Sequence, residues 1–296
     1  MGRKAIKVVD IISPVSRGWS TATLLRSAFA SLGINAQCFF YRREAGLMVH
    51  QRTDCKDKLT LLLKDSDFGE DVLGQLHHPL ICWSFDFDHE PVPKTVAWVD
   101  LYFTMCRDFI APKIQWLPQA TDPYEFKPTQ SMGGGKSDIL FIGSPKPPRA
   151  MVMEKLKAEF GQGVHSIGEG WVIGEPGAYF NDFNEAVGQS IINLALNSYS
   201  NLPQYESTWS QRVYMLAACE AFILFEYVKG IEEFFTSDEI VTFRTFDELV
   251  ELCKIYLKPE MAEARRSYGK QARERVIRDH TYVHRIKEML KWVEEL

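Results

Sequence analysis

The chain contains 296 residues, of which 46% are hydrophobic and 25% are charged, and its formal net charge is -5. This composition is typical of a globular protein, and the length suits two domains better than one. The acidic balance argues against a protein that binds nucleic acid over its whole surface, although a local basic cleft is compatible with it.

Cysteines and histidines give no sign of a metal centre. The six cysteines form no CxxC pair, and the seven histidines form no HExxH pattern. Four cysteines lie inside apolar runs, which indicates buried thiols and a reducing compartment: Cys38, Cys82, Cys106 and Cys219. No segment reaches the roughly 18 apolar residues of a membrane span. We therefore expect a cytoplasmic protein without a structural metal.

The first part of the chain alternates strand-like and helix-like segments. Residues 5–12 predict a buried parallel strand, and Ser20 can cap a helix that ends at Gly33. Further strands are expected at 36–41, 59–63, 80–85, 101–106 and 113–117, and a further helix at 69–76. This alternation predicts a parallel α/β sheet. Ligands bind such sheets at the carboxyl ends of the strands, where the loop with Gly18 follows the first strand.

A segment rich in proline and glycine, TDPYEFKPTQSMGGGKS, covers residues 121–137 and predicts a linker between domains. Its end resembles a phosphate-binding P-loop, but Gln130 stands where the first glycine is required and a strand follows instead of a helix. We therefore do not interpret it as a P-loop.

The alternation restarts after this segment. Strands are expected at 138–142, 190–196, 221–227 and 240–243, and helices at 148–160, 211–219, 246–257 and 260–296, the last with a break near 280–282. Two α/β halves joined by a glycine-rich segment predict two Rossmann-like domains that face a cleft.

Four sequence pieces between about residues 115 and 290 carry a family resemblance. They are WLPQATDP at 116–123 with Phe126 and Pro128, DILFIGS at 138–144 with Arg149, SQRVY at 210–214 leading to Gly230-Ile231-Glu232-Glu233, and HTY at 280–282 with Arg285. In their order and spacing the chain resembles the glycosyltransferases of the GT-B fold. Among these it resembles the spore-maturation-protein-like (CgeB-like) group of the glycosyl transferases group 1.

This resemblance implies both an organisation and an activity. Residues 1–122 would form an acceptor domain, 123–137 a linker, 138–280 a donor-nucleotide domain, and 281–296 a C-terminal helix that returns to the N-terminal domain. The enzyme would move a hexosyl or pentosyl group from a nucleotide-diphosphate sugar, expected to be UDP-linked, to a hydroxyl acceptor, without an essential metal or a cofactor. A small metabolite, a polysaccharide, a protein and hydroxymethylated DNA all stay open as acceptors, and so does the oligomeric state.

The leaving diphosphate gains negative charge during transfer, which basic side chains and a helix N-terminus can stabilise. The resemblance gives this role to Arg149 and Arg212, with Lys146 as a third candidate, although each could instead form a surface salt bridge. The resemblance implies that Glu232 accepts hydrogen bonds from sugar hydroxyls and that Trp171 stacks on the base. The other donor-site candidates are Gly18, Gly143, Ser144, Tyr214 and Gly230.

The acceptor hydroxyl must lose a proton, and an inverting enzyme takes it with a base of the N-terminal domain. Asp86, Asp88 and His89 directly follow the predicted strand at 80–85. Both aspartates alternate with phenylalanines, so that they lie on one side of the chain. We expect the catalytic base among these three residues; in a retaining enzyme they would only hold the acceptor.

The chain departs from the family pattern at two positions. Met215 replaces a glutamate that binds the donor ribose in relatives, and Glu220 replaces a glycine. Glu206 or Glu220 could supply a substitute carboxylate. Two other functions therefore stay open beside the transferase: a nucleotide-sugar epimerase of the same fold, and a non-catalytic binder of nucleotide sugars.

Overall fold

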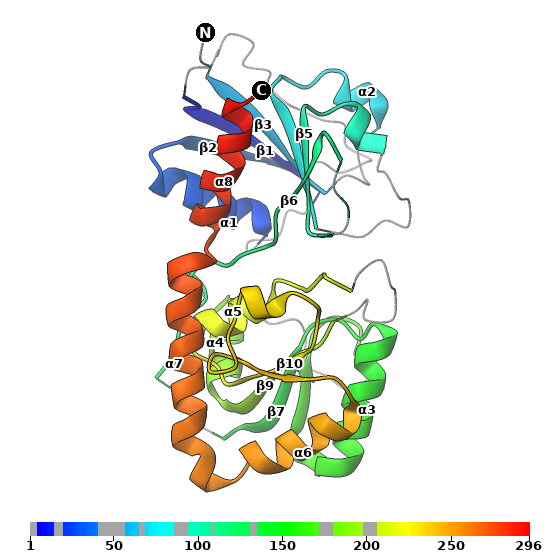
Figure 1. The fold of residues 1–296 in the computed structure, drawn as a ribbon, viewed down its shortest axis with the longest axis vertical. Helices are drawn as coiled ribbons and strands as arrows, with labels where there is room; N and C mark the ends of the chain where they lie inside the picture. Colours follow the sequence, from blue (N-terminus) through cyan, green and yellow to red (C-terminus); the bar gives the residue numbers. More distant parts are fainter. Residues whose placement is uncertain are drawn as a thin grey trace. The chain divides into compact units, whose positions relative to one another are not determined.

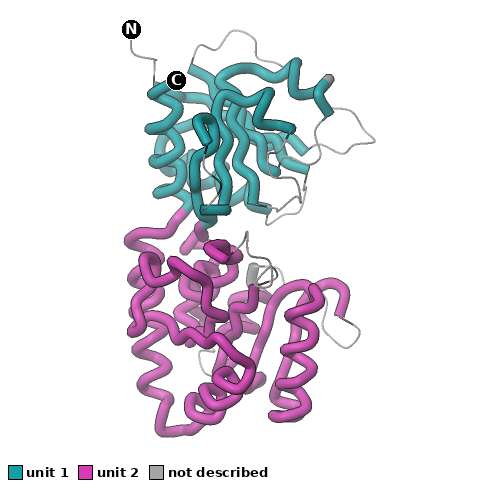
Figure 2. Tube along the Cα trace, turned by 45° about the vertical axis from the view of Figure 1, so that its right-hand side comes forward, with its two compact units in different colours: residues 1–119, 282–296 teal, residues 120–281 magenta. Residues whose placement is uncertain are grey.

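The computed structural model describes residues 5–14, 20–40, 57–64, 69–85, 94–107, 109, 111–130, 135–171, 180–197 and 206–296. The chain consists of two compact units, shown in different colours in Figure 2. Unit 1 contains residues 1–119 and 282–296, and unit 2 contains residues 120–281. The sequence pattern predicts the two divisions after residues 122 and 280. The candidates Gly18, Asp86, Asp88 and His89 lie outside the described residues.

Unit 1 contains a six-stranded parallel sheet with the order β2-β1-β3-β4-β5-β6, which confirms the predicted parallel sheet (Figure 1). Its strands are β1 Val8–Ser13, β2 Asn35–Phe40, β3 Lys58–Leu63, β4 Leu80–Ser84, β5 Leu101–Thr104 and β6 Ile114–Trp116. Strands β3, β4 and β5 are buried along their whole length, because helices and neighbouring strands cover them.

Helices α1, Thr21–Ser31, and α8, Tyr282–Glu294, contact each other in unit 1 (Figure 1). Helix α1 begins as predicted, because the Ser20 hydroxyl accepts a hydrogen bond from the backbone N–H of Thr23 (3.4 Å). Helix α2 is shorter than predicted and covers only Glu70–Leu73. The buried Arg285 of α8 donates to the carbonyl of Pro118 (2.9 Å), so that the last helix is fixed to the end of the first chain segment.

A buried ion pair lies within the unit 1 sheet. The Lys58 ammonium at the start of β3 lies 2.5 Å from a carboxylate oxygen of Asp10 in β1, and their side chains are only 1% and 4% exposed. A single buried charge without a partner would cost several kcal/mol, and in this pair each charge compensates the other. Burial, aided by the positive charge of Lys58, lowers the pKa of the nearby His77. The sequence pattern reveals neither the Lys58–Asp10 pair nor the position of His77 close to it.

Unit 2 contains a five-stranded parallel sheet with the order β11-β10-β9-β7-β8. Its strands are β7 Ser137–Ile142, β8 Val164–Ile167, β9 Ser190–Ala195, β10 Ile223–Glu226 and β11 Val241–Phe243. Counted from the first strand of each unit, the sheet of unit 1 has the doubly wound order 2-1-3-4-5-6 and that of unit 2 has the order 2-1-3-4-5. In unit 2 the strand order reverses between β7 and β9. Ligands of doubly wound sheets bind at this switch point, beyond the carboxyl ends of the strands.

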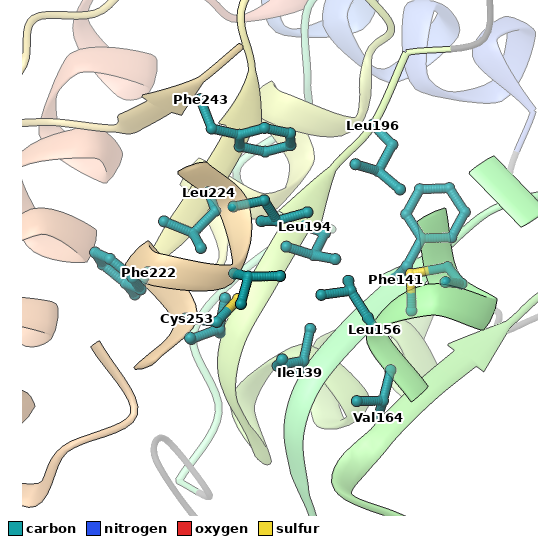
Figure 3. Packing of buried hydrophobic residues seen from close by; sticks show 14 residues of the cluster. Ile139, Phe141, Leu156, Val164, Leu194, Leu196, Phe222, Leu224, Phe243 and Cys253 are labelled. Carbon is teal, nitrogen blue, oxygen red and sulfur yellow. The ribbon is translucent and has the colours of Figure 1, made fainter. Parts of the chain in front are cut away.

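Helices cover both faces of the unit 2 sheet. They are α3 Pro147–Phe160, α4 Phe180–Gly188, α5 Arg212–Ala218, α6 Phe246–Tyr256 and α7 Ala262–Asp279. Leu156 of α3 and Cys253 of α6 pack against buried strand residues such as Leu194 and Leu224 (Figure 3). Burial raises the pKa of the Cys253 thiol to about 12, so that this cysteine behaves as a small apolar side chain.

Helix α5 ends in a Schellman turn. The Ala221 N–H donates to the Leu216 carbonyl (3.2 Å) and the Glu220 N–H donates to the Ala217 carbonyl (3.0 Å). The turn gives Glu220 a φ of 62°, the left-handed conformation that glycine adopts most easily. Gly269 of α7 packs directly on this turn, because an added Cβ would lie 2.1 Å from the Glu220 carbonyl oxygen. A glycine is therefore the residue that the backbone favours at position 220.

We predict that Glu220→Gly raises the free energy of unfolding by about 1 kcal/mol, because it removes the cost of a left-handed non-glycine residue. Urea unfolding of the full chain measures the change. Glu220→Ala is the matched control, because it removes the same carboxylate and keeps the unfavourable φ. Equal stabilities of the glycine and alanine variants would contradict the prediction.

Candidate functional site

The site forms around one backbone carbonyl at the switch point of unit 2. The Leu196 carbonyl, directly after β9, accepts hydrogen bonds from Nε of Arg149 (3.2 Å) and from Nη1 of Arg212 (3.0 Å). Arg149 lies in the first turn of α3, and Arg212 is the first residue of α5. The structure thus brings together the two arginines that the resemblance assigns to the diphosphate, although 63 positions separate them in the sequence.

Arg212 connects the ends of the neighbouring strands β7 and β9. Its Nε donates to the carbonyl of Ile142 at the end of β7, while Nη1 reaches the Leu196 carbonyl and the Ser210 hydroxyl (3.2 Å). Nη2 makes no hydrogen bond to any residue that the structure describes. The guanidinium is therefore fixed at one edge and keeps two N–H donors for another group.

Both guanidiniums lie over the ring of Phe141, the penultimate residue of β7. The distances to the ring centroid are 4.6 Å for Arg212 and 5.6 Å for Arg149. Cation–π attraction at a buried ring favours this placement of two like charges. The edge-on indole of Trp171, 6.2 Å from the Phe141 ring, completes the aromatic part of the site.

The electrostatics of the site favour an anion. Burial lowers the pKa of Arg212 well below its ordinary value, and the positive charge of Arg149 lowers it further. Arg212 nevertheless keeps its charge, because arginine is not deprotonated in proteins. Among the described residues Arg212 has no carboxylate within ion-pair distance. A phosphate group is the kind of ligand that would relieve this repulsion.

Glycines allow the loops after β7 and β8 to approach each other. A Cβ at Gly143 would lie 2.3 Å from Nη2 of Arg212, and a Cβ at Gly168 would lie 2.4 Å from the Gly143 carbonyl oxygen. That carbonyl accepts a hydrogen bond from the Trp171 indole (2.7 Å). Gly143 thus leaves room for the Arg212 guanidinium, and Ser144 beside it is exposed. Donor binding by these two residues stays a prediction. Base stacking by Trp171 stays a prediction.

Tyr214 takes a different place from the one expected of a donor-site residue. Its side chain is fully buried, and its hydroxyl accepts a hydrogen bond from the Trp209 indole (2.9 Å). Its ring packs beside Phe235 and His280. The structure therefore gives Tyr214 a packing role in the core of unit 2, because it follows Arg212 by two positions on α5 and points to the opposite side.

A second polar cluster follows β10 and β11. Gly230 has a φ of 90°, and its N–H donates to the Glu232 carboxylate (3.1 Å). The Tyr227 hydroxyl also hydrogen-bonds this carboxylate and is the largest cause of its lowered pKa. Arg244 stacks on the Tyr227 ring, 3.3 Å from its centroid. Glu232 is thus held as an ionised, exposed hydrogen-bond acceptor, the form that sugar hydroxyls require.

Two residues of the site, Asn197 and Glu226, were not predicted from the sequence. The Asn197 N–H donates to Oε2 of Glu226 (2.6 Å), and the Asn197 side-chain amide donates to the Glu226 carbonyl (3.1 Å). Both residues directly follow apolar strand cores, a position that is typical of ligand-binding residues in parallel sheets. That position is the sequence signal that could have identified them.

The arginines of α7 mostly bind within unit 2. Arg265 donates to the carbonyls of Tyr256 and Lys258, and Arg273 donates to the carbonyl of Ala218. Arg275 binds Glu239 and Asp279, while Arg278 binds Asp279. These four arginines are therefore held by contacts within unit 2. Within the described ranges, no group of three His, Cys, Asp or Glu residues could hold a metal ion, and no helix is long and apolar enough to cross a membrane.

We predict that Tyr227→Phe raises the pKa of Glu232 toward its ordinary value, because the strongest hydrogen bond to the ionised form is lost. An NMR titration of the side-chain carboxyl group measures this. With a lowered folded pKa, the stabilising effect of Glu232 is present above its unfolded pKa and is lost as the pH falls through the folded pKa. Tyr124→Phe, at a residue that is 84% exposed, is the control and should leave the titration unchanged.

Comparisons with known proteins show which family and which fold the chain is similar to. A family model described as "Glycosyl transferase-like" matches residues 149–291, which include both arginines and Glu232. No curated protein matches the chain.

Among solved structures, the chain is similar to an alpha-glucosyltransferase in complex with UDP and a 13-mer DNA containing a HMU base (10% identity, 97% of this chain and 99% of that chain, TM-score 0.67). It is also similar to Anabaena HepE in complex with UDP and glucose (9%, 98% and 100%, TM-score 0.65). A third similar structure is sucrose-phosphate synthase from Thermosynechococcus elongatus (11%, 98% and 98%, TM-score 0.63). The chain spans only 54% of the length of TarM, another similar structure. Residues 149–291 are thus similar to the glycosyl transferase-like family, and the chain has the GT-B fold of these solved structures.

Proposed function

We propose that this chain transfers a sugar from a nucleotide-diphosphate sugar to a hydroxyl acceptor. The observation that carries the proposal is the pair of guanidiniums of Arg149 and Arg212 on the Leu196 carbonyl. Two fixed like charges at the switch point of a doubly wound sheet suit a diphosphate. The free N–H donors of Arg212 would bind its oxygens.

The arginine pair would act on the leaving group. As the bond between the sugar and the diphosphate breaks, negative charge grows on the diphosphate oxygens. Donors that are already oriented stabilise this charge more strongly than water does, because they do not have to reorganise. Arg212 meets this condition, since Ile142 and Leu196 fix its guanidinium before any ligand binds. The first turn of α3, which contains Arg149, adds the positive end of a helix dipole.

UDP is the nucleotide we propose for the donor, because solved structures of similar proteins contain UDP. We assign Glu232 to hydroxyls of the transferred sugar.

Asp86, Asp88 and His89 follow β4 in the sequence and stay our candidates for the base that takes the acceptor proton. The acceptor is a hydroxyl compound, with a glycan and hydroxymethylated DNA as the first two to test. We place the reaction in the cytoplasm, a location supported by the described cysteines, which are all free thiols.

A donor panel tests the proposal. We expect a UDP-sugar to raise the melting temperature of the purified chain and to be hydrolysed slowly without an acceptor. Transfer should appear with one of two acceptor classes, oligosaccharides or duplex DNA with hydroxymethylated bases. If no nucleotide sugar stabilises the protein or is turned over, the transferase function is wrong. Solvent deuterium in the recovered UDP-sugar would instead indicate an epimerase, and tight binding without turnover a non-catalytic binder.

Arg212→Met should lower kcat/KM by about 100-fold, because it removes a fixed donor to the leaving group. Arg212→Lys should recover little of this loss, since a single ammonium nitrogen lacks the planar fork that binds the Ile142 and Leu196 carbonyls through two nitrogens and keeps a third for the ligand. Arg266→Met is the matched control, because this arginine is exposed on α7. Activity assays with the donor from the panel measure all three variants. Full activity of Arg212→Met would exclude the proposed role.

A further inference from the structure

One peptide group lies between the two arginines and a carboxylate. The carbonyl of the Leu196–Asn197 peptide accepts the guanidiniums of Arg149 and Arg212, and the N–H of the same peptide donates to Oε2 of Glu226 (2.6 Å). In a trans peptide the C=O and N–H point in opposite directions. The peptide therefore presents cations on one side and a carboxylate on the other, with rigid spacing.

The distance between these groups follows from the bonds that join them. Nη1 of Arg212 is 3.0 Å from the carbonyl oxygen, and the peptide nitrogen is 2.6 Å from Oε2. With the fixed geometry of the peptide, Nη1 and Oε2 lie at most about 8 Å apart. This spacing is comparable to the distance between a phosphate of a nucleoside diphosphate and the hydroxyls of its own ribose.

The carboxylate of Glu226 can accept a hydrogen bond from a hydroxyl. Its Oε2 accepts the Asn197 N–H, whereas its Oε1 has no hydrogen-bond partner among the described residues. The residue is half-buried at the carboxyl end of β10. Asn197 holds it in place, because its amide also binds the Glu226 carbonyl (3.1 Å) and its Oδ1 accepts the Ser210 N–H (3.4 Å). A carboxylate is an acceptor only, and therefore suits donors such as ribose hydroxyls.

We infer that Oε1 of Glu226 accepts a hydrogen bond from a ribose hydroxyl of the nucleotide whose diphosphate the arginine pair binds. This inference rests on the proposed function, because it needs the same nucleotide. Glu226 is a different residue from Glu220 and Glu206, the two carboxylates that the sequence offers as substitutes at the ribose. Glu220 precedes β10 and lies at the amino edge of the sheet, opposite the arginines. Glu206 is exposed, and its carbonyl accepts the Lys229 N–H (3.0 Å).

The test compares ribonucleotides with deoxyribonucleotides in the absence of any sugar. Isothermal titration gives the Kd of UDP, GDP and ADP and of their 2′-deoxy and 3′-deoxy counterparts. We expect the wild-type chain to bind its preferred ribonucleotide about tenfold more tightly than at least one deoxy form, as one hydrogen bond to a charged group predicts. In Glu226→Gln this difference should fall to less than about twofold, because the remaining oxygen is taken by the Asn197 N–H.

Glu206→Gln is the matched control and should keep the tenfold difference. Thermal unfolding shows that each variant is folded, and Glu226→Gln is expected to fold because it keeps an acceptor for the Asn197 N–H. Three results overturn the inference: no discrimination in the wild type, unchanged discrimination in Glu226→Gln, or its loss in Glu206→Gln. A Glu226→Gln defect seen only with the complete nucleotide sugar also overturns it, since the glutamate would then bind the transferred sugar. Failure of the proposed function is distinguishable: absence of any nucleoside diphosphate binding to the wild type removes the proposed donor site, whereas binding without sugar turnover removes only the transferase activity.

Discussion

Unit 2 is organised around a single carbonyl group that binds two positive charges. The Leu196 carbonyl accepts a hydrogen bond from each of Arg149 and Arg212, and the Phe141 ring lies under both guanidiniums. The two guanidiniums repel each other because both are positive. Their placement therefore needs backbone carbonyls that accept hydrogen bonds from them and an aromatic ring that attracts cations. These contacts satisfy the hydrogen-bonding geometry of the arginines. Because Arg212 has no carboxylate within ion-pair distance among the described residues, the site favours an anionic ligand.

The fold provides this arrangement through close backbone approaches. Strands β7 and β9 are neighbours in the sheet, so that the carbonyls of Ile142 and Leu196 both lie within reach of one guanidinium. The absence of a side chain at Gly143 leaves room for that guanidinium. At the other end of α5, the left-handed turn at Glu220 and the close approach of Gly269 fix the helix that carries Arg212. Changes far from the arginines can therefore move them.

Much of the fold could be predicted from the sequence, because parallel strands and their helices have local patterns. The capped start of α1 at Ser20 and the separate helices α7 and α8 follow from such patterns. Tyr214 could not be placed correctly, since its packing depends on Trp209 and on residues beyond position 230. The buried pair of Lys58 and Asp10 is equally invisible, because strand residues do not show which neighbour they face.

The sequence by itself determined two parallel α/β halves, the residue types that can bind a diphosphate, and the departure from the family's glycine at Glu220. Only the tertiary structure decided which groups meet. It joined Arg149 to Arg212 across 63 positions and placed Glu226 on the far side of the peptide that both arginines bind. The physical reason is that helix and strand periodicity is a local property of the chain, whereas hydrogen bonds at a switch point depend on strand order, which no local pattern encodes.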